Sequence, residues 1–275
     1  MMDTPLATTL RIHLYTLSWN EEAQLAFFFR HYDPWVSRYV FYDDGSTDGT
    51  LDLLRRHPRV EIRRFERVDP GSFVKSQQKL QNRVWKESRG AADWVVITAV
   101  DEHLHRPGFI PWLEAQDAAG VTAIPALGYQ MVDPEFPPEG AKLCEARTRG
   151  APYWLMSKLS LFKPDALLHT RFGVGRHRAR PEGQVIYPDR DELLLLHYKY
   201  VGLEYVQRRQ ASLARGLGTE DFENGWAQRY EVGDAAVEKE LRRFLARAVD
   251  VADPARDHHL THQEPRWWRE TPANG

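Results

Sequence analysis

Cysteine is nearly absent from the sequence, and segments that would direct the chain into a membrane are missing. The 275 residues contain one cysteine, Cys144, so no intrachain disulfide can form and no paired-cysteine zinc site can exist. A reducing, cytoplasmic compartment is therefore expected. The first 16 residues lack a charged segment followed by an apolar one, which argues against a signal peptide. No run of 18 apolar residues occurs, and we expect no transmembrane segment.

Neither sign of charge is in excess. Lys and Arg number 37 and Asp and Glu number 39, which gives a formal net charge of -2 and a pI near 6.6. Without an overall positive field, the chain is not expected to bind nucleic acid. Two phosphate-binding motifs, G-x-x-x-x-G-K-[ST] and G-x-G-x-x-G, are also missing.

Strand-like and helix-like segments alternate over the first 130 residues. Strands are predicted at 10–17, 38–42, 60–65, 93–100 and 121–127, and helices at 18–32, 50–57, 72–89 and 107–118. Alternation of this kind predicts an α/β fold with a mainly parallel sheet flanked by helices.

The second half is less regular. A long loop is predicted at 128–142, a strand at 153–162, a loop at 169–183 and a strand at 193–200, followed by amphipathic helices at 204–217 and 234–249. We expect residues 1–200 to form the main domain and residues 201–275 a C-terminal helical extension and tail packed on it. The histidines of this tail are expected to face solvent. The tail carries His258, His259 and His262.

Three predicted strands end in distinctive polar segments. SWNEE follows the first strand, DDGSTD the second and DEHLH the strand at 93–100. In an open α/β sheet, ligands bind beyond the carboxyl ends of the strands, so three neighbouring exits would share one cleft. Taken alone, the second segment is also an ordinary turn. It is not a calcium-binding EF-hand loop, because Arg55 stands where a bidentate Glu is required.

Together the segments TLSWNEE, YDDGSTDGT and DWVVITAVDEHLH resemble the motifs of family 2 glycosyltransferases with the GT-A fold. The resemblance covers residues 10–110 and extends more weakly to HYKY at 197–200. It implies a Rossmann-like GT-A domain that moves a sugar from a UDP-, GDP- or dTDP-sugar to an acceptor hydroxyl, with inversion. Bacterial polysaccharide or glycoconjugate synthesis is the implied setting.

The resemblance also implies roles for individual residues. Asp43 or Asp44 would face the base or ribose, while Asp48 would brace its loop. Asp101 would bind Mn²⁺ or Mg²⁺ on the donor diphosphate, as hard oxygen ligands suit both ions. The other residues implied on the nucleotide side are Thr16, Leu17, Asn20, Glu21, Asn82 and Val100.

A second metal ligand and a catalytic base have several candidates. His197, at the end of an apolar strand, is the first choice for the ligand, and His177 is the second. A zinc site of Asp101, His103 and His105 on one strand face is an alternative. The base is a carboxylate, with Asp133 and Glu135 proposed and Asp189 and Asp191 as competitors. Glu102 faces the acceptor or fixes the loop.

One departure from the family pattern keeps other functions open. The D-x-D motif reads Ala99-Val100-Asp101, so its first Asp is missing. A catalytically degenerate relative that only binds a nucleotide or sugar is therefore an alternative. A nucleotidyltransferase is a second alternative, although SWNEEAQ lacks the Gly-rich basic loop that such an enzyme needs.

Overall fold

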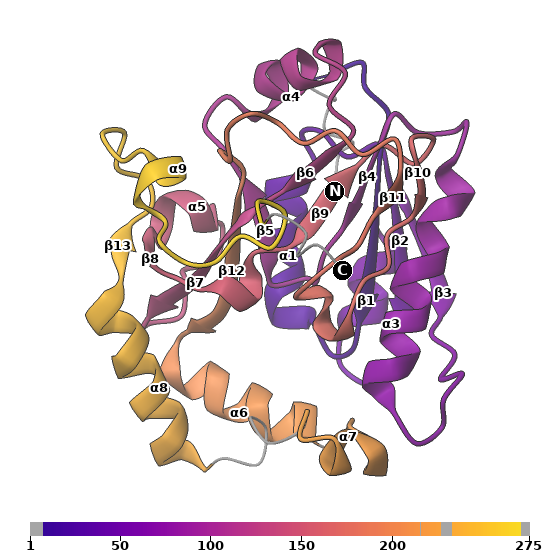
Figure 1. Ribbon diagram of the computed structural model, residues 1–275. Coiled ribbons are helices and arrows are strands. Elements are labelled where there is room, and N and C mark those ends of the chain that lie inside the picture. The colour runs from indigo at the N-terminus through magenta and orange to yellow at the C-terminus, as the bar shows by residue number, and fades with distance from the viewer. Residues whose placement is uncertain (1–7, 215, 227–232, 271–275) are drawn as a thin grey trace.

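The computed structural model describes residues 8–214, 216–226 and 233–270. Within them, a six-stranded sheet has the order β3-β2-β1-β4-β9-β6 (Figure 1). The first four strands in this order pair in parallel, and β9 is antiparallel to both of its neighbours. The expected α/β fold with a mainly parallel sheet is confirmed. The strands are β1 (Ile12–Ser18), β2 (Arg38–Asp43), β3 (Val60–Arg64), β4 (Trp94–Ile97), β6 (Ala123–Pro125) and β9 (Leu159–Phe162).

Helices cover both faces of this sheet. Ile12 and Leu14 of β1 pack into one apolar cluster with α1, whereas Tyr15 packs into another beside α3. This division follows from the alternation of side chains along a strand. The helices are α1 (Glu22–Tyr32), α2 (Thr50–Arg55), α3 (Phe73–Arg83) and α4 (Phe109–Ala118). The helix predicted through residue 89 changes to a 3₁₀ helix, η1 (Val84–Ser88), after Arg83.

A second sheet, which the sequence did not predict, has the order β13-β8-β7-β12-β5. Its strands are β5 (Glu102–His105), β7 (Leu127–Asp133), β8 (Arg149–Pro152), β12 (Leu194–Val201) and β13 (Val249–Asp250). The predicted loop at 128–142 is therefore wrong over its first part, which belongs to β7. Gly128 and Gln130 interrupt the apolar pattern there. Gly128 is needed because a Cβ would come within 2.2 Å of the Met156 backbone.

The C-terminal segment packs on the rest of the molecule. Its helices are α6 (Leu203–Ala214), α7 (Thr219–Glu223), α8 (Asp234–Arg247) and α9 (His258–Thr261), and the first three lie along one end in Figure 1. The expectation that the tail histidines face solvent is wrong for His262, which is 2% exposed and whose Nε2 lies 2.8 Å from the Gly128 carbonyl oxygen. None of the described helices is long and apolar enough to cross a bilayer.

The remaining elements are short. The strand predicted at 153–162 begins as a 3₁₀ turn, and only its second half is β9. The loop predicted at 169–183 contains one 3₁₀ turn and a two-residue strand. These elements are α5 (Leu143–Ala146), η2 (Trp154–Met156), β10 (Leu167–His169), η3 (Val174–Arg176) and β11 (Glu182–Gly183).

Candidate functional site

The exits of β1 and β2 are joined into one unit by hydrogen bonds. Asn20 adopts a left-handed conformation with φ of 53°, and its Oδ1 accepts from the backbone N–H of Thr47 at 2.7 Å. Its own backbone N–H donates to Ser46 Oγ at 2.9 Å. Asp48 accepts from the backbone N–H of Thr50 at 3.0 Å at the start of α2. Asn20 and Asp48 thus shape the two loops.

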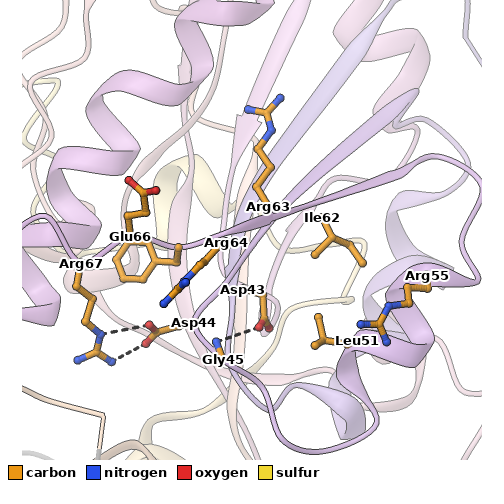
Figure 2. A pocket seen from close by; sticks show the side chains of 11 residues that line it. Asp43, Asp44, Gly45, Leu51, Arg55, Ile62, Arg63, Arg64, Glu66 and Arg67 are labelled. Atoms are coloured by element: carbon orange, nitrogen blue, oxygen red, sulfur yellow. Dashed lines mark hydrogen bonds and ion pairs between the residues drawn. The ribbon is translucent and has the colours of Figure 1, made fainter.

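Asp43 and Asp44 have different surroundings at the end of β2. Asp43 is buried, and its Oδ2 accepts from the backbone N–H groups of Gly45 and Ser46, both at 2.9 Å. Asp44 instead forms an ion pair with Arg67, 2.6 Å between Oδ2 and Nη2 (Figure 2). Asp43 therefore fixes the loop, and Asp44 with Arg67 presents polar groups to the adjoining cavity.

A cavity of about 860 Å³ opens beyond the ends of β2 and β3. Figure 2 shows carboxylates and guanidinium groups around it. This mixture suits a ligand with hydrogen-bond donors and negative charge. The lining residues are Asp43, Asp44, Gly45, Leu51, Arg55, Ile62, Arg63, Arg64, Phe65, Glu66 and Arg67.

Asp101 and His197 lie side by side, although 96 positions separate them in the sequence. His197 Nε2 is 3.3 Å from Asp101 Oδ2, and the two side chains are 12% and 29% exposed. The backbone N–H of Tyr198 donates to the Asp101 carbonyl oxygen at 2.7 Å, which ties the end of β4 to β12. Burial raises the pKa of Asp101, but attraction from His197 outweighs it and leaves the pKa below its usual value.

Glu21 is enclosed between the β1 exit and helix α6. Its carboxylate pairs with Arg209, and both side chains are mostly buried. Burial, together with the charges of Asp101 and Asp48, raises the pKa of Glu21 to about 8 against the attraction of Arg209. Since Asp48 and Asp101 both act on Glu21, the loops after β1, β2 and β4 lie at one edge of the sheet. The three neighbouring strands place them there.

Glu102, next to Asp101, is at the centre of a buried ion cluster. Its two oxygens pair with Lys158 Nζ at 2.5 Å and Arg176 Nη2 at 2.6 Å. Burial raises the pKa of Glu102, but the two cations hold it well below its usual value. With an exposed fraction of 3%, this carboxylate fixes the loop rather than meeting an acceptor.

Other predicted nucleotide-side residues lie in structural positions. The Val100 side chain is in the apolar core, so only its backbone is available to a ligand. Asn82 holds the loop after β10, donating to the Phe172 carbonyl oxygen at 3.1 Å and accepting from the Phe172 N–H at 2.8 Å. Thr16 is buried on β1, and Leu17 packs partly against the core.

The remaining candidates lie around the edge of this region. His177 Nδ1 is 2.5 Å from the Leu155 carbonyl oxygen, and burial lowers the pKa of His177 to about 3. Asp133 pairs with Arg147 at 3.4 Å, whereas Glu135 is exposed two residues beyond.

In the described residues, no group of three His, Cys, Asp or Glu side chains is arranged to hold a metal. The zinc alternative at 101–105 has no support there.

A divalent cation nevertheless fits the pair of Asp101 and His197. One carboxylate oxygen and one imidazole nitrogen already face each other at 3.3 Å. Both are ligands that Mn²⁺ accepts, and a two-residue site leaves coordination positions for phosphate oxygens and water.

Sequence reasoning missed three residues that shape this region. Arg209 looked like one of several cations on an amphipathic helix, and Gln130 lay within a predicted loop. Arg176 belongs to a Gly-flanked turn and has a left-handed φ of 57°. Gly173 and Gly175 are the sequence signal of a tight turn at Arg176, but the burial of Arg176 is known only from the structure.

Comparisons with known proteins give distant structural likenesses. No protein-family model matches the chain, and no curated protein sequence matches it. The structure is similar to that of TarS from S. aureus, with a TM-score of 0.36, 12% identity, and 86% of this chain and 43% of TarS covered. A shorter TarS structure gives a TM-score of 0.36 and 11% identity, with 86% of this chain and 71% of that one covered.

A third similar structure is glucosyl-3-phosphoglycerate synthase from Mycobacterium tuberculosis, in complex with Mn²⁺, UDP and glucosyl-3-phosphoglycerate. The TM-score is 0.31 with 18% identity, and 58% of each chain is covered. This chain thus spans about half the length of full TarS and of the synthase. At such scores, the likenesses carry no argument about what this protein binds or transforms.

Proposed function

We propose that this protein is a glycosyltransferase that takes a sugar from a nucleoside diphosphate donor and gives it to an acceptor hydroxyl. The observation that carries the proposal is the convergence of three polar strand exits at one edge of a parallel sheet. They bring the Asp44–Arg67 cavity, the Glu21 turn and the Asp101–His197 pair to neighbouring positions. Ligands of open α/β sheets bind at this edge.

Different residues bind different parts of the donor. Asp44 accepts hydrogen bonds from the base or ribose in the cavity, while Arg64 and Arg67 complement negative charge. Asp101 and His197 hold Mn²⁺ or Mg²⁺ on the diphosphate. That cation supplies Lewis-acid stabilisation to the departing nucleoside diphosphate.

Transfer with inversion needs one base and an in-line approach. The acceptor oxygen bonds to the anomeric carbon as the bond to the diphosphate oxygen breaks, and a carboxylate takes the acceptor proton. Glu135 is the better of the two proposed bases, because Arg147 already pairs with Asp133. Phe136, beside Glu135, packs on Tyr205. Burial and the charges of Glu21 and Asp101 raise the pKa of Tyr205, so Tyr205 lies near these two carboxylates.

Calorimetry tests the donor half of the proposal. UDP, GDP and dTDP are titrated into the full chain with and without Mn²⁺, and sugar nucleotides are then screened for slow hydrolysis. We expect one nucleotide to bind more tightly with Mn²⁺, and Asp101→Asn to remove that enhancement. Asp234→Asn, at the exposed start of α8, is the matched control. Absence of nucleotide binding under both conditions refutes the proposal.

A non-catalytic nucleotide-binding protein is the second candidate, favoured by Ala99 at the first D-x-D position. The same titrations distinguish the two. Metal-enhanced nucleotide binding without hydrolysis of any donor, or transfer to any acceptor, supports the binding protein. Hydrolysis that depends on Asp101 supports the transferase.

A further inference from the structure

We propose that Gln130 is a positioning residue that turns His197 so that its Nε2 lone pair and the Asp101 carboxylate face one divalent cation. The inference rests on the metal site of the proposed function and assigns a role to a residue outside it. Gln130 is on β7 and is 1% exposed. It is the register partner of His197 on the parallel strand β12.

The orientation of the Gln130 amide follows from its neighbours. One terminal atom lies 2.9 Å from the His197 carbonyl oxygen and 3.4 Å from that of Met131. Carbonyl oxygens only accept hydrogen bonds, so this atom is the donating NH₂ group. The other terminal atom is then Oε1, which lies 2.9 Å from His197 Nδ1.

The amide orientation determines the tautomer of the neutral imidazole. Because Gln130 Oε1 can only accept, Nδ1 of His197 must carry the hydrogen. A neutral ring has one hydrogen, so Nε2 is left with its lone pair. That lone pair faces Asp101 Oδ2 at 3.3 Å. With the hydrogen of the ring on Nδ1, Nε2 and the carboxylate can hold either a proton or a metal cation between them, and metal-binding imidazoles characteristically have their second nitrogen held in this way.

The backbone around the three residues fixes their positions. The register of β7 with β12 shifts between His197 and Tyr200, an irregularity that re-aims side chains at a strand end. Glu102, adjacent to Asp101, is the register partner of His197 on the other side of β12. Gln130 on β7 and His197 on β12 thus occupy paired positions, and Asp101 lies beside them in the turn that precedes β5.

Manganese binding to the full chain tests the inference without an activity assay. Free Mn²⁺ is measured by electron paramagnetic resonance in titrations with and without the nucleotide that binds best. Gln130→Leu is expected to weaken Mn²⁺ binding at least tenfold, within the range of about 10–100-fold for such outer contacts. Gln116→Leu on α4 is the matched control.

The outcomes separate this inference from the proposed function. If the parent binds Mn²⁺ and Gln130→Leu binds it within threefold, the positioning role is refuted and the metal site stands. If the parent binds no Mn²⁺ even with nucleotide, both are refuted.

A readout on the unaltered protein covers the case in which the Gln130 variant does not fold. Nitrogen-15 spectra of the histidine rings, with His197 identified by its loss in His197→Asn, are recorded at a pH where the ring is neutral. Hydrogen on Nδ1 is the expected result, and hydrogen on Nε2 overturns the inference. A role for Gln130 in packing alone predicts no fixed tautomer.

Discussion

Arg209 of helix α6 closes over the turn that follows the first strand and pairs with Glu21. Its Nη1 donates to the carbonyl oxygens of Trp19 at 2.8 Å and Asn20 at 2.9 Å, and its Nη2 donates to the Glu21 carboxylate. The two side chains are 15% and 13% exposed. A C-terminal helix therefore holds the shape of a loop at the proposed donor site, 188 positions earlier in the chain.

Removing this cation should destabilise the protein and the turn together. In Arg209→Ala, Glu21 loses its counter-ion and the two carbonyl groups lose their donor. The free energy of unfolding is expected to fall by about 3–5 kcal/mol, the usual result of breaking a buried ion pair on one side. Urea unfolding at pH 9, where the Glu21 carboxylate is charged, measures it, and nucleotide titration of the folded variant should show weaker binding.

The neighbouring residue supplies a matched control. Arg208 is 74% exposed and lies 3.9 Å from Glu204, a surface pair one helical turn away. Arg208→Ala should leave both the unfolding midpoint and nucleotide binding unchanged. Equal effects of the two substitutions would mean that α6 contributes only its general packing.

A second prediction concerns the buried ion cluster beside Asp101. Glu102→Gln leaves Lys158 and Arg176 buried without their counter-charge, and the free energy of unfolding is expected to fall by about 3–5 kcal/mol. Equilibrium unfolding in guanidinium chloride measures the loss. Glu182→Gln, which alters the exposed pair with Arg171, should not change the midpoint. A small effect of Glu102→Gln would show that water reaches the cluster.

Stability should decline as the solution becomes acidic, starting near pH 6.5. Burial lowers the pKa of His13, His31 and His105 to about 4. Between pH 6.5 and about 4, the unfolded chain binds protons at these histidines while the folded protein does not. The free energy of unfolding therefore decreases as the pH is lowered through this window. Each such group contributes about 1.4 kcal/mol per pH unit in this window.

One histidine can be removed to check that slope. His13→Asn keeps a polar atom near Ser88 Oγ, which lies 2.8 Å from His13 Nδ1. Urea titrations at half-unit steps from pH 7.5 to 4.5 should show a slope shallower by about 1.4 kcal/mol per pH unit. The exposed His169, changed to Asn, should reproduce the parental slope. An unchanged slope in His13→Asn would rule out a neutral buried ring at this position.

The parallel sheet was predictable because each of its strands has its own local pattern. Alternation in residues 10–17 and the apolar run at 93–100 mark β1 and β4 without reference to other segments. The single strand predicted at 121–127 was wrong, because Ala123–Pro125 form β6 and Leu127 begins β7 in the other sheet. Which sheet a short strand joins depends on tertiary packing, and no local pattern encodes it.

The candidate site was predictable in part. The proximity of Asp101 to His197 was expected from the motif resemblance, although His197 lies within β12 and Asp101 in the turn before β5. Arg209 and Gln130 were not expected, because their roles depend on contacts made across long stretches of sequence. A helical Arg that faces a carbonyl cluster has the same local spacing as one that faces water, so periodicity cannot distinguish them.

A last prediction concerns the attachment of the C-terminal segment. Asp191 is fully buried and accepts from Arg266 Nη1 at 2.9 Å, Trp268 Nε1 at 2.9 Å and Arg269 Nη2 at 2.8 Å. These contacts make Asp191 an anchor for the tail and remove it from the candidate catalytic bases. Asp191→Asn retains the shape but loses the charge, so the two guanidinium groups lose their counter-ion.

In Asp191→Asn, the free energy of unfolding should fall by about 1–3 kcal/mol, because the hydrogen bonds from two partly exposed guanidinium groups lose their charged acceptor. Limited proteolysis should cleave the variant after Arg266 or Arg269 at protease concentrations that leave the parent intact. Asp189→Asn, two residues earlier and exposed, should behave as the parent does. Parental protease resistance in Asp191→Asn would show that packing of Trp267 and Trp268 holds the segment, and that the ion pairs add little.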